Sequence, residues 1–197
     1  MSSDIELAAK ALVAGQIVGI PTDTVYGLAA DVLHTNAADR LFTAKRRPRQ
    51  LDLPVLVADV EQALSLATAV PDVARRLMDT WWPGALTIVL PRRPDLEVDL
   101  GDDEATIGVR CPDHEIPVAL CRAVGPLATT SANLHGEDTA TTAAEVRAAF
   151  GDSVAFVLDG GTCAGSPSTV VDCTGHDVKL LREGRIPWPE LQASLSP

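Results

Sequence analysis

A short apolar run that stops abruptly in polar residues, at residues 17–28, constrains the fold most. Residues 17–20 (Ile-Val-Gly-Ile) have the pattern of a short buried strand. Pro21 ends the strand ladder because it has no N–H to donate, and Thr22, Asp23 and Thr24 follow at once. In open α/β sheets, ligands lie just beyond the carboxyl ends of strands, so the polar trio is a candidate wall of a site. Taken alone, it fits an ordinary capped turn better, since Thr and Asp are common turn residues.

Short apolar runs and helical patterns follow one another along the rest of the chain. Helices are predicted over residues 4–14, 36–46, 59–69, 71–81, 114–124 and 143–149, and strands over residues 17–20, 54–58, 85–90, 106–110, 154–158, 168–172 and 179–184. Residues 126–133 repeat the opening pattern, an apolar run followed by hydroxyls and an amide. Asn36 is expected to cap the second helix, and Thr142 the last one with Glu145 at capping-box spacing.

This mixture of elements predicts the fold class. Strands and helices that often alternate indicate a single α/β domain, with a twisted mixed sheet flanked by helices, over residues 1–186. Residues 187–197 contain Pro187, Pro189 and Pro197 and are expected to form a short, partly ordered C-terminal tail. A length of 197 residues fits one such domain.

Charge and hydropathy limit the classes of function. The formal net charge is -11 and the isoelectric point is near 4.6, whereas proteins that coat a duplex are usually basic. Asp4 and Glu6 occupy positions where a signal peptide carries positive charge, and no apolar run is as long as a membrane span. We therefore expect a soluble cytoplasmic protein with no membrane contact.

One basic cluster stands out against this acidic background. Residues 45–49 contain four of the sixteen basic residues of the chain: Lys45, Arg46, Arg47 and Arg49. One or two cations at the end of a helix are explained by its dipole. Four neighbouring cations repel each other, which makes an anionic ligand the better explanation.

The cysteines and histidines do not indicate a metal site. The cysteines (Cys111, Cys121, Cys163 and Cys173) form no C-x-x-C pair, and the chain contains no H-E-x-x-H. We expect reduced cysteines, several of them buried as small apolar residues, and histidines at the surface or at helix caps.

Several common motifs of nucleotide-binding proteins and hydrolases are missing. The sequence contains no G-x-x-x-x-G-K-[ST], no G-x-G-x-x-G and no G-x-S-x-G. What remains is a set of hydroxyls at strand ends and isolated cations, including Arg110 and Arg182. Such groups bind phosphates and carboxylates well but are poor unaided nucleophiles. They suit phosphoryl or nucleotidyl transfer, in which positioning and electrostatics supply most of the catalysis.

Seven segments, in order, match one family pattern. They are Pro21–Leu28, Lys45–Pro48 followed by Pro54–Leu56, Trp82–Gly84, Ile107–Arg110, Ser131–Leu134, Ser168–Asp172 and Leu181–Gly184. Together they resemble the YrdC-like family, the L-threonylcarbamoyladenylate synthases, in its short form, over about residues 5 to 186. The resemblance implies a twisted α/β sheet around a deep concave cavity. It also implies a nucleotidyltransferase that converts L-threonine, bicarbonate and ATP into L-threonylcarbamoyl-AMP and pyrophosphate. Partner proteins would then transfer the threonylcarbamoyl group to an adenosine of tRNA.

The resemblance also implies roles for particular residues. Lys45 and Arg110 would carry catalysis. The ATP-binding residues would be Lys45, Arg49, Thr106, Ser131, Asn133, Thr139 and Arg182, with Arg47 close by. The threonine-binding residues would be Thr22, Pro54, Arg110, Thr129 and Ser168. Mg²⁺ would accompany the triphosphate without a protein metal site, with Asp23 as a possible indirect contributor.

The chain departs from the family pattern after Leu134. The family usually continues with Ser-Gly and a Pro-Ser-Pro-like loop, whereas Glu137 and Asp138 precede Thr139 here. Carboxylates that pointed into a nucleotide pocket would repel phosphate, so we expect both to point outward.

Two other functions share parts of this pattern. The cluster at residues 45–49 could grip RNA in a non-catalytic module for tRNA or rRNA maturation, and a weak direct tRNA contact is compatible with either function. The net charge and the scarcity of aromatic residues argue against the RNA module. A hydrolase of acyl phosphates or carbamoyl groups would need similar site chemistry. The sequence leaves open the oligomeric state, the metal and the protein that accepts the product.

Overall fold

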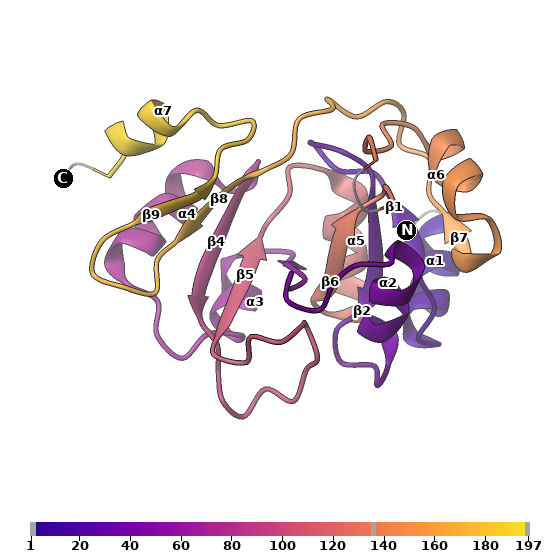
Figure 1. The fold of residues 1–197 in the computed structure, drawn as a ribbon, viewed down its shortest axis with the longest axis horizontal. Helices are drawn as coiled ribbons and strands as arrows, with labels where there is room; N and C mark the ends of the chain where they lie inside the picture. The colour runs from indigo at the N-terminus through magenta and orange to yellow at the C-terminus, as the bar shows by residue number, and fades with distance from the viewer. Residues whose placement is uncertain (1–2, 135–136, 196–197) are drawn as a thin grey trace.

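A nine-stranded mixed sheet organises the described part of the chain (Figure 1). The computed structural model describes residues 3–134 and 137–195. The strand order is β7-β1-β2-β6-β3-β5-β4-β8-β9. The strands are β1 (Val18–Ile20), β2 (Gly27–Asp31), β3 (Val55–Leu56), β4 (Leu86–Pro91), β5 (Thr106–Arg110), β6 (Leu127–Ser131), β7 (Phe156–Val157), β8 (Thr169–Asp172) and β9 (Lys179–Arg182). Parallel and antiparallel pairs both occur, which confirms the predicted mixed sheet.

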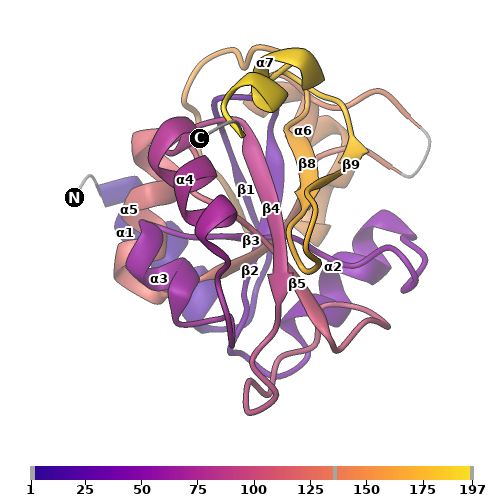
Figure 2. The same ribbon diagram turned by 90° about the vertical axis from the view of Figure 1, so that its left-hand side faces the viewer.

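Helices pack against the sheet (Figures 1 and 2). The helices are α1 (Ser3–Val13), α2 (Ala37–Lys45), α3 (Val60–Leu64), α4 (Asp72–Trp81), α5 (Glu115–Val124), α6 (Ala143–Phe150) and α7 (Trp188–Ala193), with a 3₁₀ turn, η1, at Gly151–Ser153. In Figure 2, α1, α3, α4 and α5 lie along the left side of the sheet and α2 lies on its right. None of the helices in the described ranges is long and apolar enough to cross a membrane.

Buried apolar residues at regular spacing explain how the helices dock. Ala8 and Leu12 of α1 are fully buried and pack with Leu120 of α5. Leu41 and Phe42 of α2 belong to a second, larger cluster. Residues about one helical turn apart, such as Ala8 and Leu12 or Ala38 and Phe42, lie on one face of a helix. Burial of each large apolar side chain contributes about 1.5–3 kcal/mol.

The polar trio belongs to a β-hairpin loop. Strand β2 pairs antiparallel with β1, with Ile20 opposite Gly27, so residues 21–26 connect the two strands. Strand β2 was not predicted, because Gly27–Asp31 is a short and mostly buried run without alternating polarity. The hairpin brings Thr22, Asp23 and Thr24 back over the sheet.

Three further predictions differ from the structure. Helix α3 ends at Leu64 rather than near residue 69. Asn36 precedes α2 in a left-handed conformation, and its side chain makes no capping hydrogen bond. The C-terminal residues include α7, with Leu191 fully buried, because Pro187 and Pro189 lie at the start of the helix where proline is tolerated. The predicted capping box of Thr142 and Glu145 is confirmed.

The cysteines and a histidine follow the sequence expectations in part. Cys111, Cys121 and Cys173 are buried, Cys163 is half-buried, and all four are free thiols. Burial raises the pKa of Cys111 to about 11, so this thiol is poorly reactive at neutral pH. His114 caps α5, where its Nδ1 accepts a hydrogen bond from the Ile116 N–H. His135 lies outside the described residues.

Candidate active site

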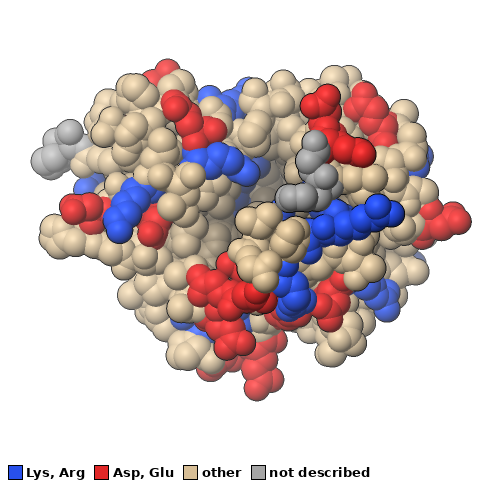
Figure 3. Space-filling view, in the orientation of Figure 1, with Lys and Arg blue, Asp and Glu red and all other residues tan. Residues whose placement is uncertain are grey.

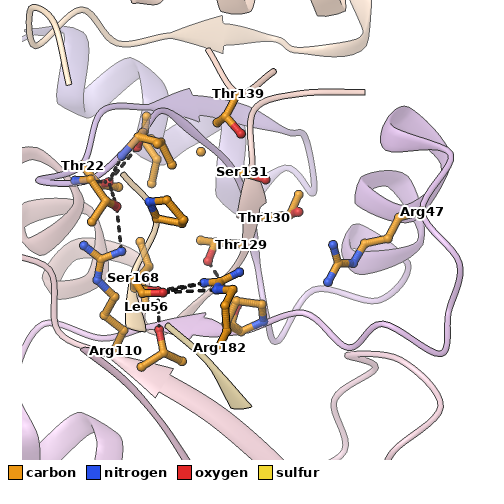
Figure 4. Close-up of a pocket in the computed structure, with 17 residues that line it drawn as sticks. Thr22, Arg47, Leu56, Arg110, Thr129, Thr130, Ser131, Thr139, Ser168 and Arg182 are labelled. Atoms are coloured by element: carbon orange, nitrogen blue, oxygen red, sulfur yellow. Dashed lines mark hydrogen bonds between the residues drawn. The ribbon is translucent and has the colours of Figure 1, made fainter. Parts of the chain in front are cut away.

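A concave cavity opens at the centre of the molecule (Figures 3 and 4). Its volume is about 280 Å³. Eight of the predicted site residues line it: Thr22, Pro54, Arg110, Thr129, Ser131, Thr139, Ser168 and Arg182. Arg47 also lines it, and no lining residue among the described ones is Asp or Glu. Several hydroxyls and three guanidinium groups therefore face a cavity without carboxylates, which suits an anionic ligand even though the whole chain is acidic.

The hairpin loop holds Thr22 through its own backbone. Thr22 Oγ1 donates to the Val25 carbonyl at 2.7 Å and accepts from the N–H groups of Thr24 and Val25 at 3.1 and 3.2 Å. The Thr24 hydroxyl lies 2.8 Å from Thr22 Oγ1. Thr22 thus closes a side-chain turn in which its hydroxyl proton is already used. Thr22 can therefore contact a ligand by packing against it, but its hydroxyl has no free proton to donate.

Arg110 lies at the end of β5 and is held on three sides. Its Nε donates to the Gly84 carbonyl at 2.9 Å, its Nη1 to Thr24 Oγ1 at 2.9 Å and its Nη2 to Asp23 Oδ1 at 2.5 Å. Burial lowers the pKa of this guanidinium, and the Asp23 carboxylate opposes that shift. Arginine stays protonated in proteins, so a buried cation is fixed in orientation at the cavity wall.

Lys45 lies behind the cavity wall rather than in its lining. Its residue is 3% exposed, and Nζ donates to Thr130 Oγ1 at 3.0 Å, the Ser131 carbonyl at 2.7 Å and Asn133 Oδ1 at 3.2 Å. These acceptors are neutral, and burial, followed by repulsion from Arg47, lowers the pKa of Lys45 to about 8. A buried ammonium without a carboxylate partner favours the approach of an anion. Asn133 Oδ1 also accepts from Ser131 Oγ at 2.6 Å. Asn133 thus holds Ser131, which lines the cavity, without lining it itself.

Arg182 and Ser168 are hydrogen-bonded to each other in the cavity wall. Arg182 Nη2 donates to the Ser168 carbonyl at 2.9 Å and to Ser168 Oγ at 3.2 Å. Thr87 Oγ1 lies 2.9 Å from Ser168 Oγ. Thr129 Oγ1 donates to the Pro54 carbonyl at 3.2 Å, which ties β6 to the residue before β3.

Besides Lys45 and Asn133, two more of the predicted ATP-binding residues lie outside the cavity lining. Arg49 forms ion pairs with Asp39 and Asp99 and lies 4.8 Å from the Phe42 ring centre. Thr106 Oγ1 donates to Asp103 at 2.5 Å. Both side chains are thus engaged by the acidic segment between β4 and β5, and acidic side chains gather there at the lower rim of the hollow in Figure 3.

Glu137 and Asp138 do not face the cavity. Both residues are exposed and neither is part of its lining, which agrees with the outward orientation expected for them. Thr139, in contrast, lines the cavity.

Sequence reasoning missed several lining residues. Thr24 and Thr130 are hydroxyls at the strand ends that the sequence had singled out, but they were not assigned to the site. Thr87 gave no signal except that it is a hydroxyl inside an apolar strand. Among the residues that the structure describes, no group of three His, Cys, Asp or Glu side chains could hold a metal ion.

This cavity and sheet define a known class of protein. Residues 10–184 match the Sua5/YciO/YrdC family model, which is described as "Telomere recombination", and the chain belongs to this family. A relative from Mycobacterium tuberculosis named putative threonylcarbamoyl-AMP synthase is 41% identical over 94% of this chain and 86% of its own length. The threonylcarbamoyl-AMP synthase of Idiomarina loihiensis is 37% identical over 90% of this chain and 97% of its own.

Solved structures show the same fold. Sua5 of Pyrococcus abyssi complexed with L-threonine superposes with a TM-score of 0.91 at 38% identity, over 96% of this chain. YciO of Escherichia coli gives a TM-score of 0.83 at 29% identity, over 92% of this chain and 89% of its own. The chain spans only 56% of the Pyrococcus Sua5 chain.

Proposed function

We propose that this protein is an L-threonylcarbamoyladenylate synthase, and within the transferases a nucleotidyltransferase. The observation that carries the proposal is a cavity that no described carboxylate lines, with arginine side chains in its wall and a buried ammonium behind that wall. Arg110 and Ser168 lie on one side, and Lys45 lies behind Thr130 on the other. The relatives named threonylcarbamoyl-AMP synthase support the same reaction.

The proposed reaction has two steps. The amine of L-threonine first combines with bicarbonate to give a carbamate and water. A carbamate oxygen then attacks the α-phosphorus of ATP, the bond to the bridging oxygen breaks, and pyrophosphate leaves with the electron pair. Because charge moves onto phosphate oxygens, positioned cations such as Lys45 and Arg182 contribute most where that charge develops.

The proposal divides the cavity between two substrates. Arg110, Ser168, Thr129, Thr22 and Pro54 form the threonine side, and Thr22 contributes through shape because its hydroxyl proton is used in its own turn. The remaining proposed contacts form the nucleotide side: Lys45, Arg47, Ser131, Asn133, Thr139 and Arg182.

Arg49 and Thr106 would join the nucleotide side only by leaving their present partners. Arg49 would have to separate from Asp39 and Asp99, and Thr106 from Asp103. Their assignment to ATP therefore remains a prediction that depends on movement of the segment between β4 and β5.

Magnesium enters the proposal only with ATP. The described donors do not form a protein cage for Mg²⁺, since no cluster of three His, Cys, Asp or Glu occurs among them and Asp23 is paired with Arg110. When bound to the triphosphate, the ion would neutralise phosphate charge.

The proposal places the reaction in the cytoplasm, with transfer of the threonylcarbamoyl group to tRNA by separate partner proteins. The RNA-binding alternative loses the observation that favoured it. Lys45 is buried, Arg49 is paired with carboxylates, and Arg47 lines the cavity and donates to backbone carbonyls. The basic cluster is thus largely engaged within the protein.

The test is product formation by the purified protein. Incubation with ATP, Mg²⁺, L-threonine and bicarbonate should release pyrophosphate and give threonylcarbamoyl-AMP, detected by mass spectrometry. Lys45→Ala should lower the rate at least about 100-fold, because a fixed positive charge near the developing charge of the transition state contributes about 3 kcal/mol. Lys10→Ala, at an exposed position on α1, is the matched control. Pyrophosphate release that does not depend on L-threonine, or a Lys45→Ala variant as fast as the control, would contradict the proposal.

A further inference from the structure

Thr87 is a hydroxyl residue at a position where an apolar residue would fit. Its neighbours on β4, Leu86 and Ile88, are fully buried in the main apolar cluster. Side chains alternate along a strand, so Thr87 lies on the other face, where it lines the cavity while only 4% exposed. Valine has the same shape, and a buried hydroxyl is unfavourable unless it forms a hydrogen bond.

The hydrogen-bond partner of Thr87 is the Ser168 hydroxyl, at 2.9 Å between the two Oγ atoms. Ser168 is 6% exposed and receives a second hydrogen bond from Arg182 Nη2 at 3.2 Å. A guanidinium only donates, so Ser168 Oγ is the acceptor in that contact. A hydroxyl that accepts from a cation becomes a stronger donor in turn.

Three other hydroxyls of the cavity direct their protons to carbonyl or amide oxygens of the protein. Thr22 donates to the Val25 carbonyl, Thr129 to the Pro54 carbonyl and Ser131 to Asn133 Oδ1. Thr87 and Ser168 instead share one hydrogen bond, and no carbonyl or carboxylate among the described residues accepts from either hydroxyl. The two hydroxyls carry two protons, and their mutual hydrogen bond uses one of them. The other proton is available to a ligand.

Ser168 is the better placed of the two to serve an anion. Figure 4 shows it between the side chains of Arg110 and Arg182. Burial is the main cause that lowers the pKa of Arg110, and repulsion from Arg182 adds to it. If Ser168 donated to Thr87, its oxygen lone pairs would face an anion held between the two arginines. If Thr87 donates to Ser168, then Ser168 accepts twice and donates once, which uses its full hydrogen-bonding capacity.

We propose that Thr87 is a positioning residue of the amino-acid subsite. Its hydroxyl donates to Ser168 Oγ and so directs the Ser168 proton to a carboxylate oxygen of the bound amino acid. This inference rests on the proposed function, since it takes L-threonine as the ligand at Arg110 and Ser168.

The test compares Thr87→Val, which keeps the shape and removes the hydroxyl, with Thr87→Ser, which keeps the hydroxyl. Isothermal titration calorimetry measures the affinity for L-threonine, and pyrophosphate release gives KM for L-threonine and for ATP. We expect Thr87→Val to weaken L-threonine binding about tenfold, because one hydrogen bond to a charged group is involved, while KM for ATP changes less than about twofold. Thr87→Ser should restore L-threonine affinity to near the wild-type value.

A double-mutant cycle separates positioning from general damage. In a Ser168→Ala background the hydroxyl that Thr87 orients is gone, so Thr87→Val should weaken L-threonine binding no further. Melting temperatures identify variants that fail to fold, and Thr87→Cys, with its weak S–H donor, replaces Thr87→Val if that variant is unfolded.

The outcomes distinguish this inference from the proposed function. Wild-type protein that neither binds L-threonine nor consumes ATP in its presence would overturn both. Wild-type activity together with unchanged L-threonine affinity in folded Thr87→Val, or with fully additive losses in the double-mutant cycle, would overturn only the role of Thr87.

Discussion

Asp23 and Arg110 form an ion pair that joins the first hairpin to the centre of the sheet. The distance between Asp23 Oδ1 and Arg110 Nη2 is 2.5 Å, and the side chains are 12% and 7% exposed. Asp23 lies in the loop between β1 and β2, whereas Arg110 ends β5, and strands β2, β6 and β3 lie between β1 and β5. The pair therefore fixes a loop across three strands and sets the orientation of the cavity wall.

Asp23→Asn should destabilise the fold, because Arg110 would remain buried without its charge partner. Loss of one member of a buried pair costs about 3 kcal/mol, which urea unfolding followed by circular dichroism can measure. Asp138→Asn is the control, since Asp138 is exposed and forms no described ion pair. A change in the free energy of unfolding of less than about 0.5 kcal/mol for Asp23→Asn would show that the pair is not needed for stability.

If Lys45 binds the phosphates as proposed, nucleotide affinity should depend on pH. Burial lowers the pKa of Lys45 to about 8 in the free protein. The side chain is therefore mostly charged at pH 7 and loses its positive charge above pH 8. A phosphate binds the charged form, so affinity for a non-hydrolysable ATP analogue should be constant below pH 8. Above pH 8 it should fall toward about tenfold per pH unit.

Calorimetry from pH 7 to 9.5 measures this profile. Lys45→Met should bind weakly with no such decline, because the titrating group is gone. A wild-type affinity that is unchanged at pH 9.5 would show that the Lys45 charge does not act on the phosphates.

Much of the fold followed from the sequence where an element carried its own signal. Helix α4 has a continuous amphipathic pattern, and the Thr142–Glu145 capping box marks the start of α6, so both were placed correctly. Strand β2 was missed because its first four residues, 27–30, are all buried and show no alternation of polar and apolar residues. This strand forms by pairing with β1 and β6, and the local sequence does not reveal that pairing.

The sequence predicted which types of residue form the candidate site better than it predicted where their side chains point. Hydroxyls and cations at strand ends predicted Arg110, Ser168 and Arg182 in the lining. Arg49 has the same chemistry, but Asp99 from a distant loop binds it, and sequence order does not reveal that contact. The domain boundary at residue 186 remains a prediction.

A contact between Arg49 and ATP should make KM for ATP depend on salt and on the carboxylates that pair with Arg49. Its ion pairs with Asp39 and Asp99 are substantially exposed, so salt screens them and they contribute little to stability. If Arg49 turns to ATP, Asp99→Asn should free it and lower KM for ATP about two- to fivefold at about 20 mM salt. The gain should disappear at about 300 mM salt, where exposed charges are screened. Asp95→Asn, which removes an exposed pair with Arg93 instead, is the matched control, and an equal effect in both variants would refute a specific role for Arg49.

Thr22 should matter for the turn more than for hydrogen bonding to substrate. Thr22→Val removes the acceptor for two backbone N–H groups, so we expect a loss of about 2 kcal/mol in the free energy of unfolding. Thr22→Ser keeps the hydroxyl and should retain both stability and KM for L-threonine. If Thr22→Val is as stable as the wild type but binds L-threonine much more weakly, the hydroxyl serves the substrate rather than the loop.

Leu191 tests whether the C-terminal helix α7 is part of the fold. Its side chain is fully buried in the main apolar cluster, although the prolines at 187 and 189 had suggested a partly ordered tail. Leu191→Ala should destabilise the protein by about 2–4 kcal/mol, because it leaves a cavity in the apolar cluster. Leu181→Ala is the control, since Leu181 is 58% exposed on β9. Equal urea midpoints for Leu191→Ala and the wild type would mean that α7 does not dock, whereas a large loss confined to Leu191→Ala places residues 188–193 within the cooperative unit.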